Sequence, residues 1–287
     1  MNSKSIAAWA CIGIGCASVA TADELTEQSS SQQTLRFAGA GRTLDVRTIQ
    51  GAIAVEAYDG RDVEMLIKKS IRADTQDDLR AAETEVTMET SDEATAIRAI
   101  AHYPDQPVCG ERSDRRHSWP ERRYDVRYDF TIRVPRDTRL ELCTMNTGNI
   151  IVQGARGDFL IRTINGRITL MDVSGSGEAT TINGQVIATF VSAPRGSSLF
   201  KTINGNVIVT MPEGLAADLR MKTFNGGLYT DFDVQTLPST ALVKAERRDG
   251  KFVYRSTGFT TVRAGGGGPE LTLETLNGDV RVLKRAK

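Results

Sequence analysis

The sequence is poor in the side chains that most enzymes use for catalysis or metal binding. Among its 287 residues there are only two histidines, His102 and His117, and four cysteines. No His-x-x-x-His or Cys-x-x-Cys spacing occurs, so no zinc-ligand motif is present. A nucleophile elbow and the Gly-Lys-Ser/Thr ending of a phosphate-binding loop are also missing. The sequence therefore predicts no metal ion, no cofactor and no catalytic residue.

Net charge is the second thing that the chain lacks. It has 36 basic and 36 acidic residues, and removal of Lys4 with the leader described below leaves 35 basic against 36 acidic residues, a net charge of −1. This balance gives no electrostatic reason to expect a nucleic acid or an anionic membrane as partner.

A long apolar run is missing as well. Lys4 provides a positive start, residues 6–19 are small and apolar, and Ala20-Thr21-Ala22 fits a signal-peptidase site. The run is too short for a membrane span. We therefore expect residues 1–22 to be a signal peptide, an exported protein in the periplasm or on the cell surface, and no membrane span after its removal. A lipid anchor at Cys16 is the less favoured alternative, because Gly13-Ile14-Gly15 lacks the usual leucine-like residue.

Export would leave two cysteines, Cys109 and Cys143. In an oxidising compartment two such residues favour a disulfide over a metal site. Closing a separation of 34 residues would stabilise the fold by about 3–4 kcal/mol if the effect is entropic. Two free, buried thiols are the alternative.

What the sequence does contain is a repeated phrase, Thr, an apolar residue, Asn and Gly. One copy, at residues 144–148, has an extra Thr147. An imperfect copy at 48–51 has Gln50 in place of asparagine. The asparagines are 19, 18, 21 and 21 residues apart, followed by a gap of 52. A period near 20 indicates one small unit that stacks on copies of itself. The predicted Asn-Gly corners are Asn146, Asn165-Gly166, Asn183-Gly184, Asn204-Gly205, Asn225-Gly226 and Asn277-Gly278.

Both arms of each copy alternate apolar and polar residues with period two, which predicts β-strands. The apolar phase slips between the arms, and this slip marks a corner that Asn-Gly accepts at low cost. We therefore favour an all-β fold, a β-solenoid of ~20-residue rungs. Its asparagine amides would form a ladder with a structural role. The alternative is an antiparallel β meander or sandwich in which Asn-Gly closes hairpins. It does not explain why the threonine and the apolar residue also recur.

The repeat also sets the domain boundaries. We expect a flexible segment at residues 23–34 and one β-repeat domain at 35–287, with a first rung at 44–58 and insertions at 61–140 and 231–268. In the first insertion, residues 63–71 and 129–134 resemble strands, and residues 74–82 resemble a helix with Asp74 or Thr75 as its cap. The glycine run 265–268 is interpreted as a flexible return into the last rung.

Three segments of the chain resemble a known protein family. The repeated phrase, the segment 265–273 (Gly-Gly-Gly-Gly-Pro-Glu-Leu-Thr-Leu) and the opening Asp45-Val46-Arg47-Thr48 are similar to the bacterial "putative adhesin" family of β-strand repeat proteins. The resemblance covers residue 35 to the end. It implies an exported, right-handed β-solenoid-like fold in the cell envelope. The family is a domain of unknown function, so no functional residue is carried over.

The segment 103–124 is the predicted binding loop, because arginine and tryptophan are enriched at binding hot spots. Five acidic residues balance its five arginines, so a solvated lid pinned by Cys109 is the alternative. The binding candidates are Arg112, Arg115, Arg116, Trp119, Arg122 and Arg123.

These observations predict a non-enzymatic binding module of the cell envelope, whose partner is an unknown protein or glycan. A periplasmic scaffold or envelope-stress component is one alternative. A polysaccharide-cleaving enzyme is another. It would use Asp231 and Asp233 as paired carboxylates on one strand face, although a solvated turn explains these two residues more simply.

Overall fold

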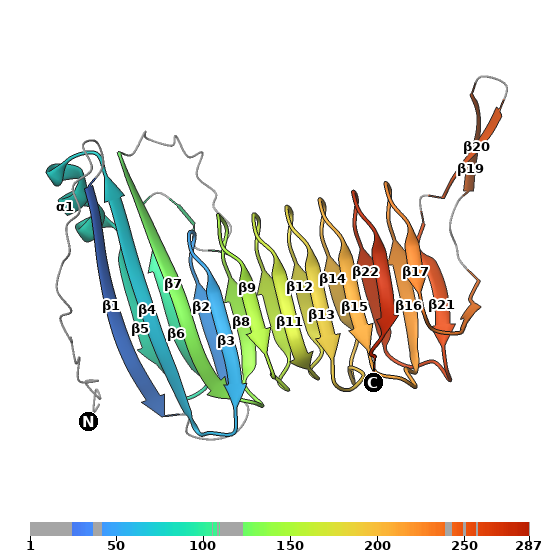
Figure 1. The fold of residues 1–287 in the computed structure, drawn as a ribbon, viewed down its shortest axis with the longest axis horizontal. Coiled ribbons are helices and arrows are strands. Elements are labelled where there is room, and N and C mark those ends of the chain that lie inside the picture. The colour runs from blue at the N-terminus through green and yellow to red at the C-terminus, as the bar shows by residue number, and fades with distance from the viewer. Residues whose placement is uncertain are drawn as a thin grey trace.

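The computed structural model describes residues 25–36, 42–104, 106–107, 109, 123–238, 243–248, 251–256 and 258–286. The described chain is almost all β, with one helix and two large mixed sheets that run along the length of the molecule (Figure 1). The all-β prediction is therefore confirmed. Residues 1–22, which the sequence predicts to be a signal peptide, lie outside the described residues.

The first sheet has ten strands. Their order in space is β1 (Leu25–Arg36), β4 (Asp62–Ala73), β7 (Tyr124–Pro135), β3 (Ile53–Tyr58), β9 (Ile150–Gln153), β11 (Ile168–Val173), β13 (Val186–Phe190), β15 (Val207–Met211), β23 (Val280–Lys284) and β17 (Leu228–Thr230).

The second sheet has eleven strands. Their order is β18 (Val234–Thr236), β21 (Thr260–Ala264), β16 (Ala217–Lys222), β22 (Glu270–Glu274), β14 (Ser198–Lys201), β12 (Gly177–Thr180), β10 (Phe159–Arg162), β8 (Arg139–Cys143), β2 (Thr43–Arg47), β6 (Ala96–His102) and β5 (Thr87–Asp92). A separate hairpin is formed by β19 (Val243–Arg248) and β20 (Lys251–Ser256).

Each copy of the phrase joins one strand of the eleven-stranded sheet to one strand of the ten-stranded sheet. We call such a strand, corner and strand a rung. The strands of neighbouring rungs pair in parallel in both sheets. Each Asn-Gly corner therefore connects one sheet to the other and does not close an antiparallel hairpin. Two sheets around one core also fit the sandwich-like description. The rungs are β2–β3, β8–β9, β10–β11, β12–β13, β14–β15, β16–β17 and β22–β23.

The rungs do not stack wholly in chain order. The last rung, β22–β23, lies between β14–β15 and β16–β17, and it pairs with both. At the other end the first rung, β2–β3, lies inside β6 and β7. Both terminal rungs of the repeat are therefore flanked on each side by other parts of the chain.

The core lies between the sheets and is lined by alternate residues of each strand. On the eleven-stranded sheet the inward residues Leu142, Ile161 and Phe200 are buried. Phe200 packs edge-on against Phe190 of the opposite sheet, with ring centroids 5.9 Å apart. Such pairs add to the stabilisation from apolar burial.

The N-terminal end of the core is covered by the first predicted insertion. Its strands β4 and β7 and its helix α1 (Gln76–Glu85) lie where the sequence indicates them. Thr75 caps α1 by accepting a hydrogen bond from the Asp78 amide. The helix packs against β4 and β7 and buries Leu79. A polar outer helix at the end of a stack protects the core from water.

One boundary prediction is wrong. Residues 23–34 were expected to be flexible, but residues 25–36 form β1, which pairs antiparallel with β4 along its whole length. The segment is polar, which is why its sequence resembles a linker. It is ordered by main-chain hydrogen bonds to a long neighbouring strand, with only Leu25 and Leu35 packing against the core.

Candidate functional site

The corners of the rungs are built from the four residues of the phrase, and each has a different task. The threonine points between the rungs, and it is buried in every copy except the one at Thr223, where it is half-buried. In five copies its hydroxyl donates to the carbonyl oxygen of the corner glycine in the preceding rung of the stack, at 2.8–3.0 Å. These pairs are Thr144 to Gly51, Thr181 to Gly166, Thr202 to Gly184, Thr275 to Gly205 and Thr223 to Gly278.

Two threonines of the phrase do not make this bond. Thr48 donates instead to the carbonyl of Gln50 in its own corner at 3.0 Å. Thr163 is buried, and its hydroxyl has no hydrogen-bond partner among the described residues. The neighbouring corner is the one that carries the extra Thr147, which adopts a left-handed backbone with a φ of 50°. The inserted residue thus coincides with the one irregular step in the threonine row.

The asparagine side chains form a continuous hydrogen-bonded row across six rungs. Each amide donates to the side-chain oxygen of the preceding asparagine, at 2.7–3.2 Å. The order in space is Asn146, Asn165, Asn183, Asn204, Asn277 and Asn225. These bonds tie successive corners together and fix their register.

The corner glycines pass so close to one another that a side chain has no room. A Cβ built on Gly205 would lie 2.1 Å from the carbonyl oxygen of Gly184, and one on Gly278 would lie 2.1 Å from that of Gly205. Such distances are far below contact, so the stack needs glycine because of the approach of the next rung as well as the turn.

The second residue of the phrase, directly after the threonine, faces outward. Because the threonine side chain is buried, the alternation of a strand turns its neighbour to the opposite side. The main-chain carbonyl of this residue accepts a hydrogen bond from the main-chain N–H of the asparagine in the next rung, at 2.7–2.9 Å. These positions are therefore in register along the stack. They form a row that we call the apolar stripe, which is Met145, Ile164, Ile182, Ile203, Leu276 and Phe224 in spatial order.

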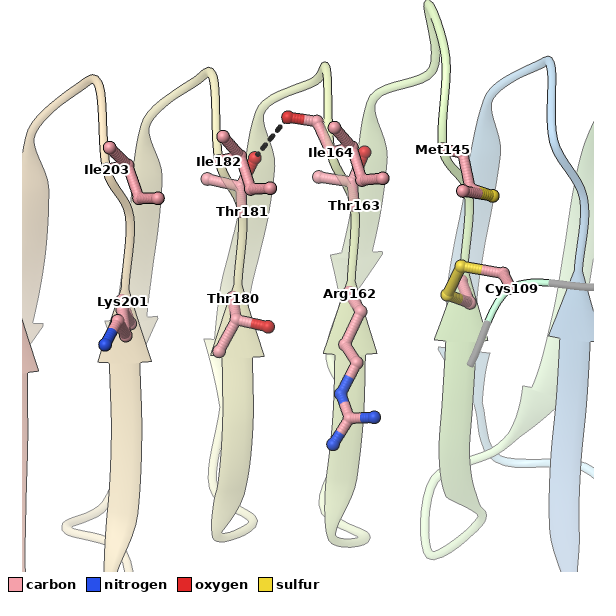
Figure 2. Close-up of a pocket in the computed structure, with 11 residues that line it drawn as sticks. Cys109, Met145, Arg162, Thr163, Ile164, Thr180, Thr181, Ile182, Lys201 and Ile203 are labelled. Atoms are coloured by element: carbon pink, nitrogen blue, oxygen red, sulfur yellow. Dashed lines mark hydrogen bonds between the residues drawn. A yellow bond between two sulfur atoms is a disulfide. The ribbon is translucent and has the colours of Figure 1, made fainter. Parts of the chain in front are cut away.

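The two ends of the stripe differ in exposure. Met145 is partly buried against the core, whereas Ile182 is 39%, Leu276 45% and Phe224 61% exposed. The stripe borders a shallow groove of about 420 Å³ that runs from Cys143 past Ile164 and Ile182 to Ile203 (Figure 2).

A mostly polar row lies beside the stripe, formed by the residues that precede each threonine. Figure 2 shows Arg162, Thr180 and Lys201 in this row, below the isoleucines. Arg162 pairs with Glu178 at 3.5 Å, and Lys201 pairs with Glu274 at 3.0 Å. The charges beside the stripe are thus paired, and its own residues carry none.

The disulfide between Cys109 and Cys143 is present, as predicted. It lies at the covered end of the stripe, next to Met145 (Figure 2). Nearby, the Tyr103 hydroxyl donates to the Val126 carbonyl and lies 3.3 Å from Thr48 of the first rung. Burial raises the pKa of Tyr103 to about 12, so this residue stays neutral and structural.

Most of the predicted binding loop cannot be compared with the structure. Arg112, Arg115, Arg116, Trp119 and Arg122 lie outside the described residues. Arg123 is exposed just before β7.

The paired-carboxylate alternative placed Asp231 and Asp233 on one strand face. Both lie instead in the connection between β17 and β18. There Asp231 accepts a hydrogen bond from the Lys284 amide at 3.1 Å. A turn that ties β17 to the C-terminal strand accounts for them.

Within the described ranges, no group of three or more His, Cys, Asp or Glu side chains is placed to hold a metal ion. No helix there has the length and apolarity to cross a membrane.

Comparison with known proteins gives no family. No family model matches the chain, and no curated protein matches it. Among solved structures it is similar to a "putative cell adhesion protein" from Clostridium sporogenes, with 11% identity over 90% of this chain and 100% of that one and a TM-score of 0.39. A "putative adhesin" from Bacteroides fragilis is 10% identical over 90% and 97%, with a TM-score of 0.36. At these values the likeness is too low to support an argument about function.

The apolar stripe is the feature that sequence reasoning missed. The sequence shows the recurring apolar residue after each threonine, and the slip of the apolar phase predicts a corner but not an exposed row. The slip itself was the signal, because an apolar residue next to a buried threonine cannot face the core as well.

Proposed function

We propose that this protein is an exported, non-enzymatic binding module of the bacterial envelope, and that it binds a protein partner along the apolar stripe. The supporting observation is that the repeat keeps an apolar residue at a position that faces solvent, from Ile182 to Phe224. Scattered exposed apolar residues need no explanation, but a contiguous row of them marks an interaction surface. In this proposal the rungs form a β-solenoid that serves as a straight, rigid support for the row.

The chemistry of the stripe favours a protein over a glycan. Its exposed members are aliphatic except for Phe224 at one end. Glycan hydroxyls buried against aliphatic carbon would lose hydrogen bonds to water without replacement, and this costs free energy. An aliphatic protein surface loses nothing of that kind and gains from apolar burial. The paired charges of the neighbouring row would then form the polar rim of the interface.

The experiment that tests this proposal is site-specific photo-crosslinking in cells. A photoreactive residue at Ile203 would sample the stripe, and the matched control at Ile208 would sample the outer face of β15 only a few residues away. We expect a discrete protein adduct from position 203 that position 208 does not give. Binding of the identified, purified protein should then be lost in the double variant Ile182→Thr/Ile203→Thr, whose melting temperature should stay close to that of the parent.

Two outcomes would contradict the proposal. The first is binding that the double variant retains. The second is retention on envelope polysaccharide or lipid vesicles that depends on Ile182 and Ile203 while no protein adduct forms. The predicted loop is tested separately by replacing Arg115, Arg116 and Trp119 together, because unchanged partner binding would exclude it from the interface.

Location decides between an adhesin and a periplasmic scaffold. Protease treatment of intact cells, followed by blotting for this chain and a known periplasmic control, distinguishes them. Loss of this protein alone would place it on the surface. Protection until the outer barrier is opened would favour the periplasmic scaffold or envelope-stress component.

A further inference from the structure

The C-terminal part of the chain takes an indirect path. Strands β21 and β22 are separated by only residues 265–269, a length typical of a β-hairpin loop. They nevertheless do not pair with each other. Strand β16 lies between them, antiparallel to β21 and parallel to β22.

The connection between them crosses directly over the chain that leads into β16. A Cβ on Gly265 would lie 2.7 Å from the carbonyl oxygen of Leu215, and one on Gly268 would lie 2.5 Å from that of Ala216. Gly265 and Gly267 also have φ values of 58° and 75°. The glycine run is therefore a close crossing and not a flexible return, which corrects the interpretation made from the sequence.

A simpler arrangement is available to the same strands. The rung β16–β17 follows β14–β15 in the chain and could stack directly on it, with β22–β23 as the outermost rung. Because both rungs carry the phrase, the corner threonine, asparagine and glycine would fit either place equally well. Something outside the phrase must select the interleaved order.

The row of residues that precede the threonines supplies the difference. In the observed order Glu274 lies between Lys201 and Lys222, with oxygen-to-nitrogen distances of 3.0 and 3.8 Å. In the sequential order Lys201 and Lys222 would be direct neighbours on adjacent strands, where like charges repel. We infer that Glu274, held between these two lysines, selects the interleaved order of the last two rungs against the sequential one.

Other contacts of β16 agree with this order. Asp218 accepts two hydrogen bonds from Arg263 of β21, at 2.7 and 2.8 Å, and Arg220 pairs with Glu270 of β22 at 3.3 Å. The side chains of β16 are thus joined to both of its neighbours. The inference is independent of the proposed function, since it concerns only which rung stands next to which.

Two pairs of cysteines report the order in the full-length protein. Leu199 and Thr272 are register partners of β14 and β22, so Leu199→Cys/Thr272→Cys should form a disulfide only in the interleaved order. Arg220 is the β16 partner of Thr272, so Leu199→Cys/Arg220→Cys should form one only in the sequential order. In the observed structure the second pair is two strand spacings apart, about 9–10 Å, which a disulfide cannot span.

The charges are then exchanged in both cysteine backgrounds. Lys222→Glu/Glu274→Lys makes the sequential order alternate in charge and puts two lysines side by side in the interleaved one. We expect the ratio of the 199–220 to the 199–272 product to rise about tenfold, and to fall back at high salt, which screens exposed charges. The exchange Arg162→Glu/Glu178→Arg, in the interior of the stack, is the matched control and should leave the ratio unchanged.

A 199–220 product that exceeds the 199–272 product in the parent protein would contradict the interleaved order itself. An unchanged ratio in a folded exchange variant would overturn the role of Glu274. If the exchange variant does not fold, the single variant Glu274→Gln gives the decision, because it removes the attraction of both lysines for residue 274 without creating a repulsive pair in the interleaved order. It should raise the 199–220 product above the parent level, and a ratio equal to that of the parent would reject the inference.

Discussion

The side-chain amide of Asn277 donates a 2.7 Å hydrogen bond to Asn204, although 73 residues separate them in the sequence. Asn204 in turn donates to Asn183 at 2.7 Å. Asn204 therefore stands in the middle of the row, with one bond made to each side.

This position makes the stability of an Asn204→Ala variant informative. The substitution removes two hydrogen bonds, and we expect the free energy of unfolding to fall by about 1–2 kcal/mol. Asn225 lies at the end of the row and donates only to Asn277, so Asn225→Ala should cost about half as much. Thermal or urea unfolding measures both. Equal melting temperatures for Asn204→Ala and the parent would show that the row does not stabilise the stack.

The corner glycines give a second prediction. Gly205→Ala would place a methyl group against the Gly184 carbonyl, and we expect a loss of about 1–3 kcal/mol from the resulting displacement. Gly266→Ala is the control, since nothing lies within 4 Å of its Cβ. If both variants unfold at the same denaturant concentration, close approach is not the reason for the corner glycines.

Asp129 predicts how stability depends on pH. Burial raises the pKa of this carboxyl, but hydrogen bonds from Arg127 and the Ala52 amide, with the nearby positive charges, outweigh it and lower the pKa below its ordinary value of 3.8. The ionised form is therefore favoured by folding, so its stabilisation is present above pH 3.8 and is lost as the pH falls through the lower value in the folded state.

Asp129→Asn should accordingly unfold at a lower urea concentration than the parent at pH 7, and the difference between the two midpoints should shrink as the pH falls below 3.8. Asp233→Asn, exposed in the β17–β18 connection, is the control and should follow the parent at both pH values. A difference for Asp129→Asn that is as large at pH 3 as at pH 7 would contradict this account of its charge.

The disulfide predicts a response to reductant. Breaking the bond between Cys109 and Cys143 frees a loop of 34 residues, and we expect a loss of about 3–4 kcal/mol. Unfolding with and without dithiothreitol measures it. The double variant Cys109→Ser/Cys143→Ser should be as unstable as the reduced parent and should not respond to dithiothreitol. A parent that unfolds identically in both conditions would show that the bond does not stabilise the fold.

Much of the fold follows from the period of the phrase. Equal spacing predicts equivalent corners, and the parallel pairing of neighbouring rungs is what brings those corners together. The order of the last two rungs cannot be predicted in this way, because two copies with the same phrase fit either place in the stack equally well. The choice depends on Glu274 and on a crossing over residues 215–216, and both are contacts between segments far apart in the chain.

The candidate site could be predicted less well. The phrase predicts where an apolar residue recurs, but the direction of Ile182 or Ile203 depends on which side of the corner the buried threonine takes. Strand β1 is a second feature that the sequence does not predict. Its sequence has no apolar face to indicate a strand. It is ordered by antiparallel main-chain pairing with β4 along its whole length.

The two interleaved ends also bear on how such a protein can change in size. A new copy of the phrase added at either end would break pairings that link distant segments, such as those of β22 with β14 and β16. A copy inserted between β8 and β15 would disturb only its two neighbours. The interior is therefore where the molecule can lengthen, in steps of one rung or about 4.8 Å, and each step would add one more apolar residue to its row. Evolution or an engineer could in this way adjust the reach of the stripe to a longer partner without redesigning either end.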